Sequence, residues 1–375
     1  PRGGQKAGYA NLIAQQAGFN IVLPLVAPPG APNELTLVSP GPPPVITQLP
    51  GTTSGRENPN FQATDLAVPG HKVQDVISTR PNANPAAGQQ QLDALVLGIP
   101  WLALNISRSQ LEWAEALDAT TIFLWIGNND ALVADTTGMP SSMTPIATFT
   151  ASYQSLIGQL LQNTKANLII ANIPDVTLVP YLTPAPVVLA ELSAASGVPT
   201  AQLSVLLGIG PGDLVNPNGI QQAQAILQMK QAPPISDAGF LSAAEVATVQ
   251  AQVNAMNAVI SQQAQFAGAT LIDVHSFFNA VAAGGVTVNG RPVTNQFLGN
   301  AFSLDGIHPT NTGYALLANY FIDNINNNLK TSIPDVNVSA IAMSDPLFHA
   351  VQPPPGARLR IPVNAGQHVD QVINH

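Results

Sequence analysis

An aspartate and a histidine three residues apart, Asp305 and His308, stand in the segment SLDGIHPTNTG. A carboxylate that hydrogen-bonds an imidazole holds it in one tautomer, so that the other ring nitrogen can take a proton from a hydroxyl. A proline and a predicted helix start follow at once. The Asp305–His308 dyad is therefore a candidate for the general base of a nucleophilic enzyme, whose hydroxyl must come from elsewhere.

Two further groups of candidate residues lie where predicted strands give way to loops. Gly70 ends the segment FQATDLAVPG, and the apolar segment TTIFLWIGNND ends in the run from Gly127 to Asp130. The carboxyl ends of parallel strands meet at the edge of the sheet where ligands bind. We therefore expect Gly70, Asn129 and the dyad to lie close together.

Helical and continuous apolar segments alternate along the chain, which predicts an α/β fold: a three-layer α/β/α, doubly wound, mostly parallel sheet of the flavodoxin-like kind. The continuous apolar segments are typical of strands buried on both faces of such a sheet. The predicted helices span residues 8–18, 109–119, 149–164, 242–268 and 312–329, and the predicted strands fall within 61–70, 120–130, 167–174 and 269–278.

Three regions depart from this alternation. Residues 183–240 are rich in Ala, Leu and Pro and are interpreted as a helical cap inserted in a domain that spans 1–330. An Asn-Gly pair between β-branched residues in VTVNGRPVT predicts a hairpin. Residues 27–60 are interpreted as a proline-rich loop, and 331–375 as a C-terminal extension packed on the body.

Composition excludes several classes of function. The chain has 375 residues, of which 46% are hydrophobic and only 9% charged, with a net charge of −9. A nucleic-acid partner would need clustered Lys and Arg, so none is expected. There are no cysteines, which excludes disulfides and thiolate metal sites, and no apolar run is long enough to span a membrane. The 34 prolines make stiff loops, which favours a secreted or extracellular protein, in a bacterium also a periplasmic or cell-surface one.

Together these segments resemble the conserved blocks of the SGNH, or GDSL, hydrolase family of esterases and lipases. The family's second block ends in a glycine that matches Gly70, its third block matches Gly127 to Asp130, and its fifth block matches the dyad. The resemblance implies that Asp305 orients His308 as the general base of a Ser-His-Asp mechanism. It also implies that the Asn129 amide and the Gly70 N–H line an oxyanion hole, with Gly127 and Asp130 as supporting residues of their motif.

The chain departs from the family at the first block, G-D-S-[LI], which carries the nucleophilic serine and is absent. That block precedes a helix like residues 8–18, so we expect the serine and a central strand to lie upstream of Pro1. Within the chain Ser54, in GTTSG, is an alternative nucleophile, although a flexible loop serine is the simpler interpretation. Ser303 is expected to pack behind the dyad.

Simpler interpretations accompany the remaining candidates. An isolated D-x-x-H can be a helix cap, and GNND can be an Asn-rich turn. His71 is interpreted as a solvated loop residue and His275 as a core or capping residue, whereas Trp125 is assigned to the core. The other histidines lack metal-ligand spacing, so neither a metal nor an organic cofactor is expected.

Two functions follow from the sequence. The first is an extracellular serine hydrolase that cleaves small-molecule or lipid carboxylic esters and whose apolar cap admits an acyl chain. The second is a non-catalytic structural or self-assembling protein that keeps the SGNH fold.

Overall fold

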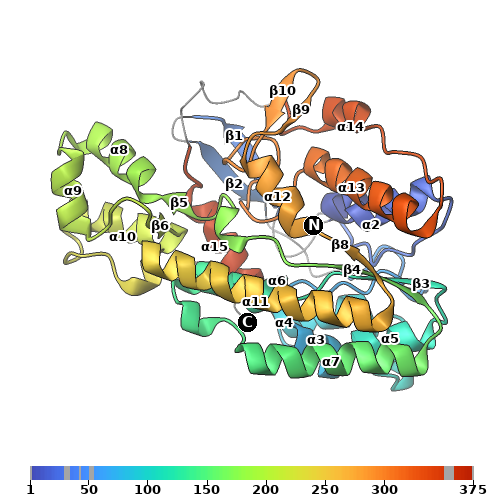
Figure 1. Cartoon of the computed structure of the whole chain (residues 1–375). Helices are drawn as coiled ribbons and strands as arrows, with labels where there is room; N and C mark the ends of the chain where they lie inside the picture. The colour runs from blue at the N-terminus through green and yellow to red at the C-terminus, as the bar shows by residue number, and fades with distance from the viewer. Residues whose placement is uncertain (1, 29–33, 42–43, 50–54, 350–358, 374–375) are drawn as a thin grey trace.

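A three-layered α/β body forms the larger part of the molecule in the computed structural model (Figure 1). The structure describes residues 2–28, 34–41, 44–49, 55–349 and 359–373. The main helices of the body are α2 (Tyr9–Gln16), α3 (Val73–Ser78), α4 (Gln89–Asp93), α5 (Gln110–Ala116), α6 (Asn128–Thr137), α7 (Ile146–Asn163), α11 (Ala243–Ala267), α12 (Val274–Ala282) and α13 (Asn311–Leu329). Among the described residues, no helix is long and apolar enough to cross a membrane.

Parallel strands β3 (Thr121–Leu124), β4 (Asn167–Ala171) and β8 (Thr270–Ile272) form the sheet of the body, in the order β3-β4-β8. Helices α7 and α11 lie on one side of it, and α13 with α2 on the other (Figure 1). The predicted α/β fold class is therefore confirmed. The strands form because their apolar side chains can be buried on both faces, as in β4, where four of the five residues are buried.

The prediction of a strand within residues 61–70 is wrong. This segment runs without regular structure, and its backbone contacts the segment of Val22 instead of the sheet. The Thr64 and Asp65 N–H groups donate to the Val22 carbonyl at 2.9 and 3.2 Å, and the Val22 N–H donates to Thr64 Oγ1 at 2.8 Å. A strand is defined by pairing with a neighbour, and within the described residues β3 pairs only with β4.

Two hairpins flank the body. Residues 27–60 were expected to form a loop, but the antiparallel strands β1 (Glu34–Ser39) and β2 (Val45–Leu49) occur there, because β-branched and apolar residues alternate with polar ones. The predicted Asn-Gly hairpin is confirmed, with β9 (Val286–Val288) paired to β10 (Arg291–Val293) and positive φ at both turn residues.

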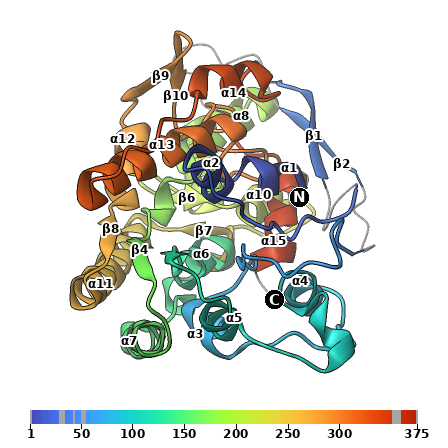
Figure 2. The same cartoon turned by 90° about the vertical axis from the view of Figure 1, so that its right-hand side faces the viewer.

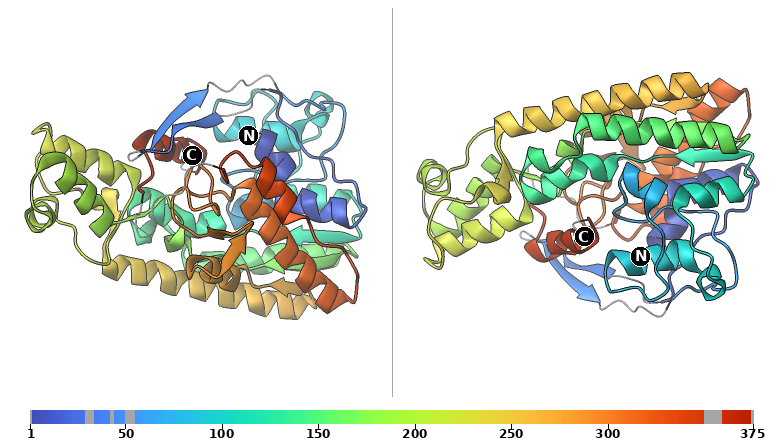
Figure 3. Two further views of the ribbon diagram at one scale, coloured as in Figure 1. Left: turned by 90° about the horizontal axis from the view of Figure 1, so that it is seen from above. Right: turned by 90° about the horizontal axis from the view of Figure 1, so that it is seen from below.

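Residues 183–241 form a separate lobe that projects beyond the end of the sheet (Figure 3). Its elements are β5 (Thr183–Pro184), α8 (Ala185–Ser196), α9 (Thr200–Leu207), β6 (Leu214–Val215), α10 (Pro217–Leu227) and β7 (Phe240–Leu241). Leu203, Leu207 and Val215 belong to a buried cluster of its own, distinct from the main core. The region interpreted as a helical cap thus also contains a small antiparallel sheet.

The C-terminal extension forms two helices, α14 (Val338–Ser344) and α15 (Val363–Ile373). The first packs on α13, where the buried Asp345 carboxylate accepts hydrogen bonds from the Thr312 N–H and hydroxyl. The second lies against both α10 and β2 (Figure 2). The extension therefore contacts the lobe as well as the body.

A buried carboxyl group without partners lies at Asp135, in the second half of α6. Its side chain is fully buried, and neither carboxyl oxygen has a hydrogen-bond partner among the described residues. Burial raises the pKa of Asp135 well above its ordinary value, and the nearby charge of Asp175 raises it further. The folded state therefore favours the protonated form of this group, because an ionised carboxylate in an apolar environment lacks solvation.

We predict that Asp135→Asn stabilises the protein at pH 7, because the carboxyl group ionises readily in the unfolded chain but not in the buried site, whereas an amide ionises in neither state. The gain amounts to about 1.4 kcal/mol for each unit by which burial raises the pKa. The folded-state pKa of Asp135 lies above the unfolded one, so the aspartate's penalty grows as pH rises above about 4 and vanishes below it. Urea unfolding of both proteins at pH 4 and pH 7 measures the difference. The exposed Asp237→Asn is the control and should change little; an equal effect of both variants would refute the prediction.

Candidate active site

The dyad forms in the loop that precedes α13. His308 Nδ1 lies 2.7 Å from Asp305 Oδ2, and the His308 side chain is 53% exposed while that of Asp305 is 15% exposed. The other carboxylate oxygen, Oδ1, accepts from Ser303 Oγ at 2.8 Å and from the N–H groups of Ile307 and His308 at 3.0 Å. Ser303 thus donates to the carboxylate behind the imidazole and does not face the histidine as a nucleophile would.

The electrostatics of the dyad favour one tautomer. Burial alone would raise the pKa of Asp305, but the His308 charge and the hydrogen bonds to the carboxylate hold it well below its ordinary value. The loss of part of its water shell would lower the pKa of His308, but the Asp305 carboxylate outweighs this effect and raises the pKa. Asp305 therefore stays ionised and accepts the Nδ1 hydrogen, so that in the neutral imidazole Nε2 has the free lone pair.

The loop holds this geometry because Gly306 has a positive φ of 73°. A Cβ at this position would lie 2.8 Å from the backbone nitrogen of Tyr181, whose N–H donates to the Gly306 carbonyl at 3.0 Å. Immediately after the dyad, the Thr310 side chain accepts from the Gly313 N–H and caps α13. The dyad therefore lies between a glycine turn and a capped helix start.

Gly70 and Asn129 come together although 58 residues separate Asn129 from His71, the residue after Gly70. Gly70 has a φ of 84°, which favours glycine. The Asn129 amide nitrogen donates to the His71 carbonyl at 2.9 Å. An amide carries two N–H donors, so one remains for a ligand beside Gly70.

Gly127 and Asp130 position this part of the site. Gly127 precedes α6 with a φ of 114°, and a Cβ there would approach Ile173 Cδ1 to 2.9 Å and the Phe149 ring to 3.1 Å. The buried Asp130 carboxylate accepts the Val73 N–H at 3.0 Å, at the start of α3, although burial raises its pKa. Neither residue lines the pocket, so both can affect its geometry only through the residues that they contact.

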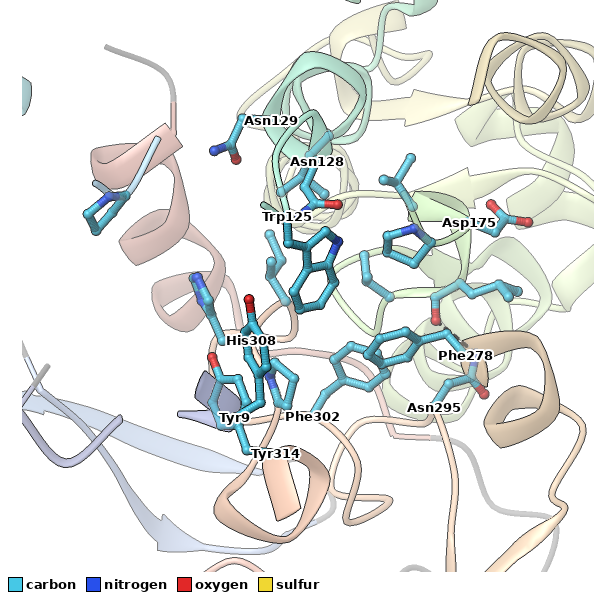
Figure 4. A pocket seen from close by; sticks show the side chains of 18 of the residues that line it. Tyr9, Trp125, Asn128, Asn129, Asp175, Phe278, Asn295, Phe302, His308 and Tyr314 are labelled. Carbon is cyan, nitrogen blue, oxygen red and sulfur yellow. Dashed lines mark hydrogen bonds between the residues drawn. The ribbon is translucent and has the colours of Figure 1, made fainter. Parts of the chain in front are cut away.

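One pocket, with a volume of about 220 Å³, contains Gly70, Asn129 and His308 in its lining (Figure 4). His308, Tyr9 and Tyr314 gather at one end, and Phe278 and Asn295 lie at the other (Figure 4). Most of the other lining side chains are apolar, among them Trp125, Leu132, Val176, Val179 and Phe302. The expected meeting of the candidate residues therefore occurs, whereas their individual roles stay predictions.

Sequence reasoning missed several residues of this pocket. Tyr9 and Tyr314 line it, and burial chiefly raises the pKa of both phenols, so both hydroxyls remain neutral. Trp125 was assigned to the core but also lines the pocket, with its indole N–H donating to the Asn172 carbonyl at 3.1 Å. Its place two residues before Gly127, at a predicted strand end, was the available signal. For Tyr9, about 300 residues before the dyad, the sequence carries no such signal.

The histidines outside the dyad differ from one another. The prediction that His71 is a solvated loop residue is wrong, because only 2% of its surface is exposed. His275 has its backbone N–H bonded to Asn172 and its ring nitrogen Nδ1 3.2 Å from the Ile173 carbonyl, as a structural histidine would.

No serine is among the described residues that line the pocket. Ser54, the alternative nucleophile within the chain, lies outside the residues that the structure describes. The pocket thus contains a base and hydrogen-bond donors, while the source of the hydroxyl stays a prediction.

Comparison with known proteins gives one result. The model of the GDSL-like lipase/acylhydrolase family matches residues 44–321, a region that includes Gly70, Asn129 and the dyad. Neither the curated proteins nor the solved structures contain a significant match.

We predict that the His308 imidazole titrates above the ordinary histidine value of about 6.5 and that Asp305→Asn lowers its pKa, because the neutral amide no longer stabilises the imidazolium. Since the folded-state pKa is raised, this pair stabilises the fold fully below about pH 6.5 and loses that effect as pH rises through the higher value. NMR titration of the histidine ring protons measures both pKa values. The remaining histidines serve as internal controls, and an unchanged His308 midpoint in Asp305→Asn would contradict the assignment.

Proposed function

Because the chain belongs to the GDSL-like lipase/acylhydrolase family, we propose that it hydrolyses carboxylic esters in this pocket, with His308 as the general base. The observation that supports the proposal is the dyad itself: Asp305 occupies Nδ1 of His308 at 2.7 Å and leaves Nε2 available beside an apolar pocket. That pocket also contains Asn129 and Gly70, two neutral hydrogen-bond donors suited to an oxyanion.

The proposed reaction has two halves. A serine oxygen attacks the ester carbonyl carbon while its proton passes to His308 Nε2, and Asp305 stabilises the resulting imidazolium. The carbonyl oxygen becomes an oxyanion that accepts hydrogen bonds from the Asn129 amide and the Gly70 N–H. The tetrahedral intermediate then expels the alcohol, which takes the proton from His308. Water repeats the sequence on the acyl-enzyme, releases the carboxylic acid and restores the serine.

We predict that a fluorophosphonate probe, which labels activated serines, reacts with the protein expressed from its complete gene. His308→Ala should slow labelling at least about 100-fold, because the hydroxyl loses its base. His349→Ala is the matched control, because this exposed histidine contacts the Met343 carbonyl and the Phe348 ring and does not line the pocket. Mass spectrometry of the labelled peptide identifies the nucleophile, which we expect ahead of Pro1.

A label on Ser54 would show that the expectation of a nucleophile ahead of Pro1 is wrong. Equal labelling of the His308→Ala and His349→Ala variants would remove His308 from the mechanism.

One observation favours a second function. The absence of serine from the described pocket lining would suit a protein that keeps the hydrolase fold for structure or self-assembly without catalysis. The same experiment separates the two functions, because such a protein would react with the probe neither in its native form nor in either variant.

The proposed acyl site lies in the body. No residue from 183–240 lines the pocket, so the cap contributes no side chain to the proposed acyl site. Phe278, from α12, stands at the end of the pocket away from His308, with its ring 5.6 Å from that of Phe302 (Figure 4). A linear acyl chain with its carbonyl near His308 would extend toward this ring, which limits its length.

We predict that Phe278→Ala shifts the preference toward acyl chains two or three carbons longer, because removal of the ring deepens the pocket. The ratio of kcat/KM for a long over a short p-nitrophenyl ester should rise about tenfold or more, since each methylene contributes about 1 kcal/mol or more. Phe277→Ala is the matched control, because this neighbouring ring contacts Phe278 and Tyr320 but does not line the pocket. A preference that shifts equally in both variants would place the acyl chain elsewhere.

A further inference from the structure

His71 is a buried polar residue that the proposed reaction does not use. Its ring nitrogen Nε2 lies 2.8 Å from Asp93 Oδ1, and Nδ1 contacts Gln110 Oε1. The orientation of the Gln110 amide is determined by its nitrogen, which donates to the Leu66 carbonyl at 2.9 Å. Both ring nitrogens therefore face oxygen atoms, and each of these contacts needs one hydrogen.

The partners of His71 belong to two helices that hold the loop around Gly70 from outside. Asp93 ends α4 and Gln110 begins α5. At the start of α4, the Gln89 amide nitrogen donates both to Asp93 Oδ1 at 2.9 Å and to the Pro69 carbonyl at 3.0 Å. Residues on both sides of Gly70 are thus tied to the same carboxylate group, one directly and one through Gln89.

His71 also contacts the second candidate oxyanion donor. Its backbone carbonyl accepts the Asn129 amide at 2.9 Å. The peptide bond between Gly70 and His71 directly follows the Gly70 N–H in the backbone. A shift of this one residue would therefore move both donors, and a displacement of about 1 Å can lower a rate about 100-fold.

We propose that His71, tethered by Asp93 and Gln110, is a positioning residue for the oxyanion hole. The inference deepens the proposed ester hydrolysis and rests on it. A buried imidazole is unfavourable unless its nitrogens are hydrogen-bonded, and an apolar residue would fill the same space without that requirement. The hydrogen bonds from His71 to Asp93 and Gln110 lie beside the His71 carbonyl that accepts from Asn129. Small displacements at this place affect the transition state more than substrate binding.

The test is Asp93→Ala, which removes the Nε2 partner without touching the pocket. We expect kcat for p-nitrophenyl esters to fall about 10- to 100-fold and KM to change less than about twofold, because the oxyanion donors act in the transition state. Asp93→Asn should restore only part of kcat, because Asp93 Oδ1 faces His71 Nε2 and also accepts from the Gln89 amide, and one amide atom cannot donate to the first and accept from the second.

Asp75→Ala is the matched control. This carboxylate also holds local backbone together, accepting from the Lys72 N–H at 2.9 Å and from Thr79 Oγ1 at 3.0 Å, but within the described part of the chain it is hydrogen-bonded to neither His71 nor Asn129. Its removal should destabilise α3 without lowering kcat. Equal kcat values in Asp93→Ala and Asp75→Ala would overturn the inference.

A second measurement does not depend on turnover. The Asn129 side-chain amide, assigned by its loss in Asn129→Ala, should shift in the ¹H–¹⁵N spectrum of Asp93→Ala and not in that of Asp75→Ala. If the native protein cleaves no ester, the proposed function fails, but the Asn129 amide signal still shows whether the Asp93–His71 contact determines the position of Asn129. An Asn129 amide unchanged in Asp93→Ala overturns the inference in either case.

Discussion

Two hydrogen bonds between distant segments hold the candidate site together. The Asp130 carboxylate accepts the Val73 N–H at 3.0 Å across 57 residues, and the Asn129 amide donates to the His71 carbonyl at 2.9 Å across 58 residues. Oxyanion donors are effective only at hydrogen-bond distance from the developing charge, and these bonds determine where the loop after Gly70 lies relative to α6. The burial of Asp130 strengthens this constraint, because a buried carboxylate that lost the Val73 N–H would be left without one of its partners.

Two aspartates with little exposure show how donors decide charge in this fold. Asp305 receives four hydrogen bonds, including one from Ser303 and two from His308, and its pKa falls below the ordinary value. Asp135 receives none from the described residues, and its pKa rises. The dyad can therefore keep a negative charge next to an apolar pocket, because the loop before α13 supplies the donors that water would otherwise provide. The same pocket suits the proposed acyl chain.

The candidate site is separate from the inserted lobe. The pocket is lined by residues of the body, whereas the lobe of 183–241 has its own buried cluster and its own small sheet. Helix α15 contacts both the lobe and the hairpin β1–β2, with the Asn364 side chain donating to the Ile46 carbonyl at 2.7 Å. The lobe can thus be held in place without contributing a residue to the pocket, which places the proposed acyl specificity on α12 and the loop of Phe302.

The sequence by itself determined what depends on neighbours in the chain: the alternation of helices and apolar strands, the Asn-Gly hairpin, and the dyad, whose members are three residues apart. It also indicated that Gly70 and Asn129 belong near that dyad, through strand ends and family resemblance. Only the tertiary structure decided that residues 61–70 find no strand partner, that His71 is buried, and that Tyr9 lines the pocket. The physical reason is that burial and strand pairing depend on which distant segment supplies the neighbouring surface, and local periodicity carries no information about that neighbour.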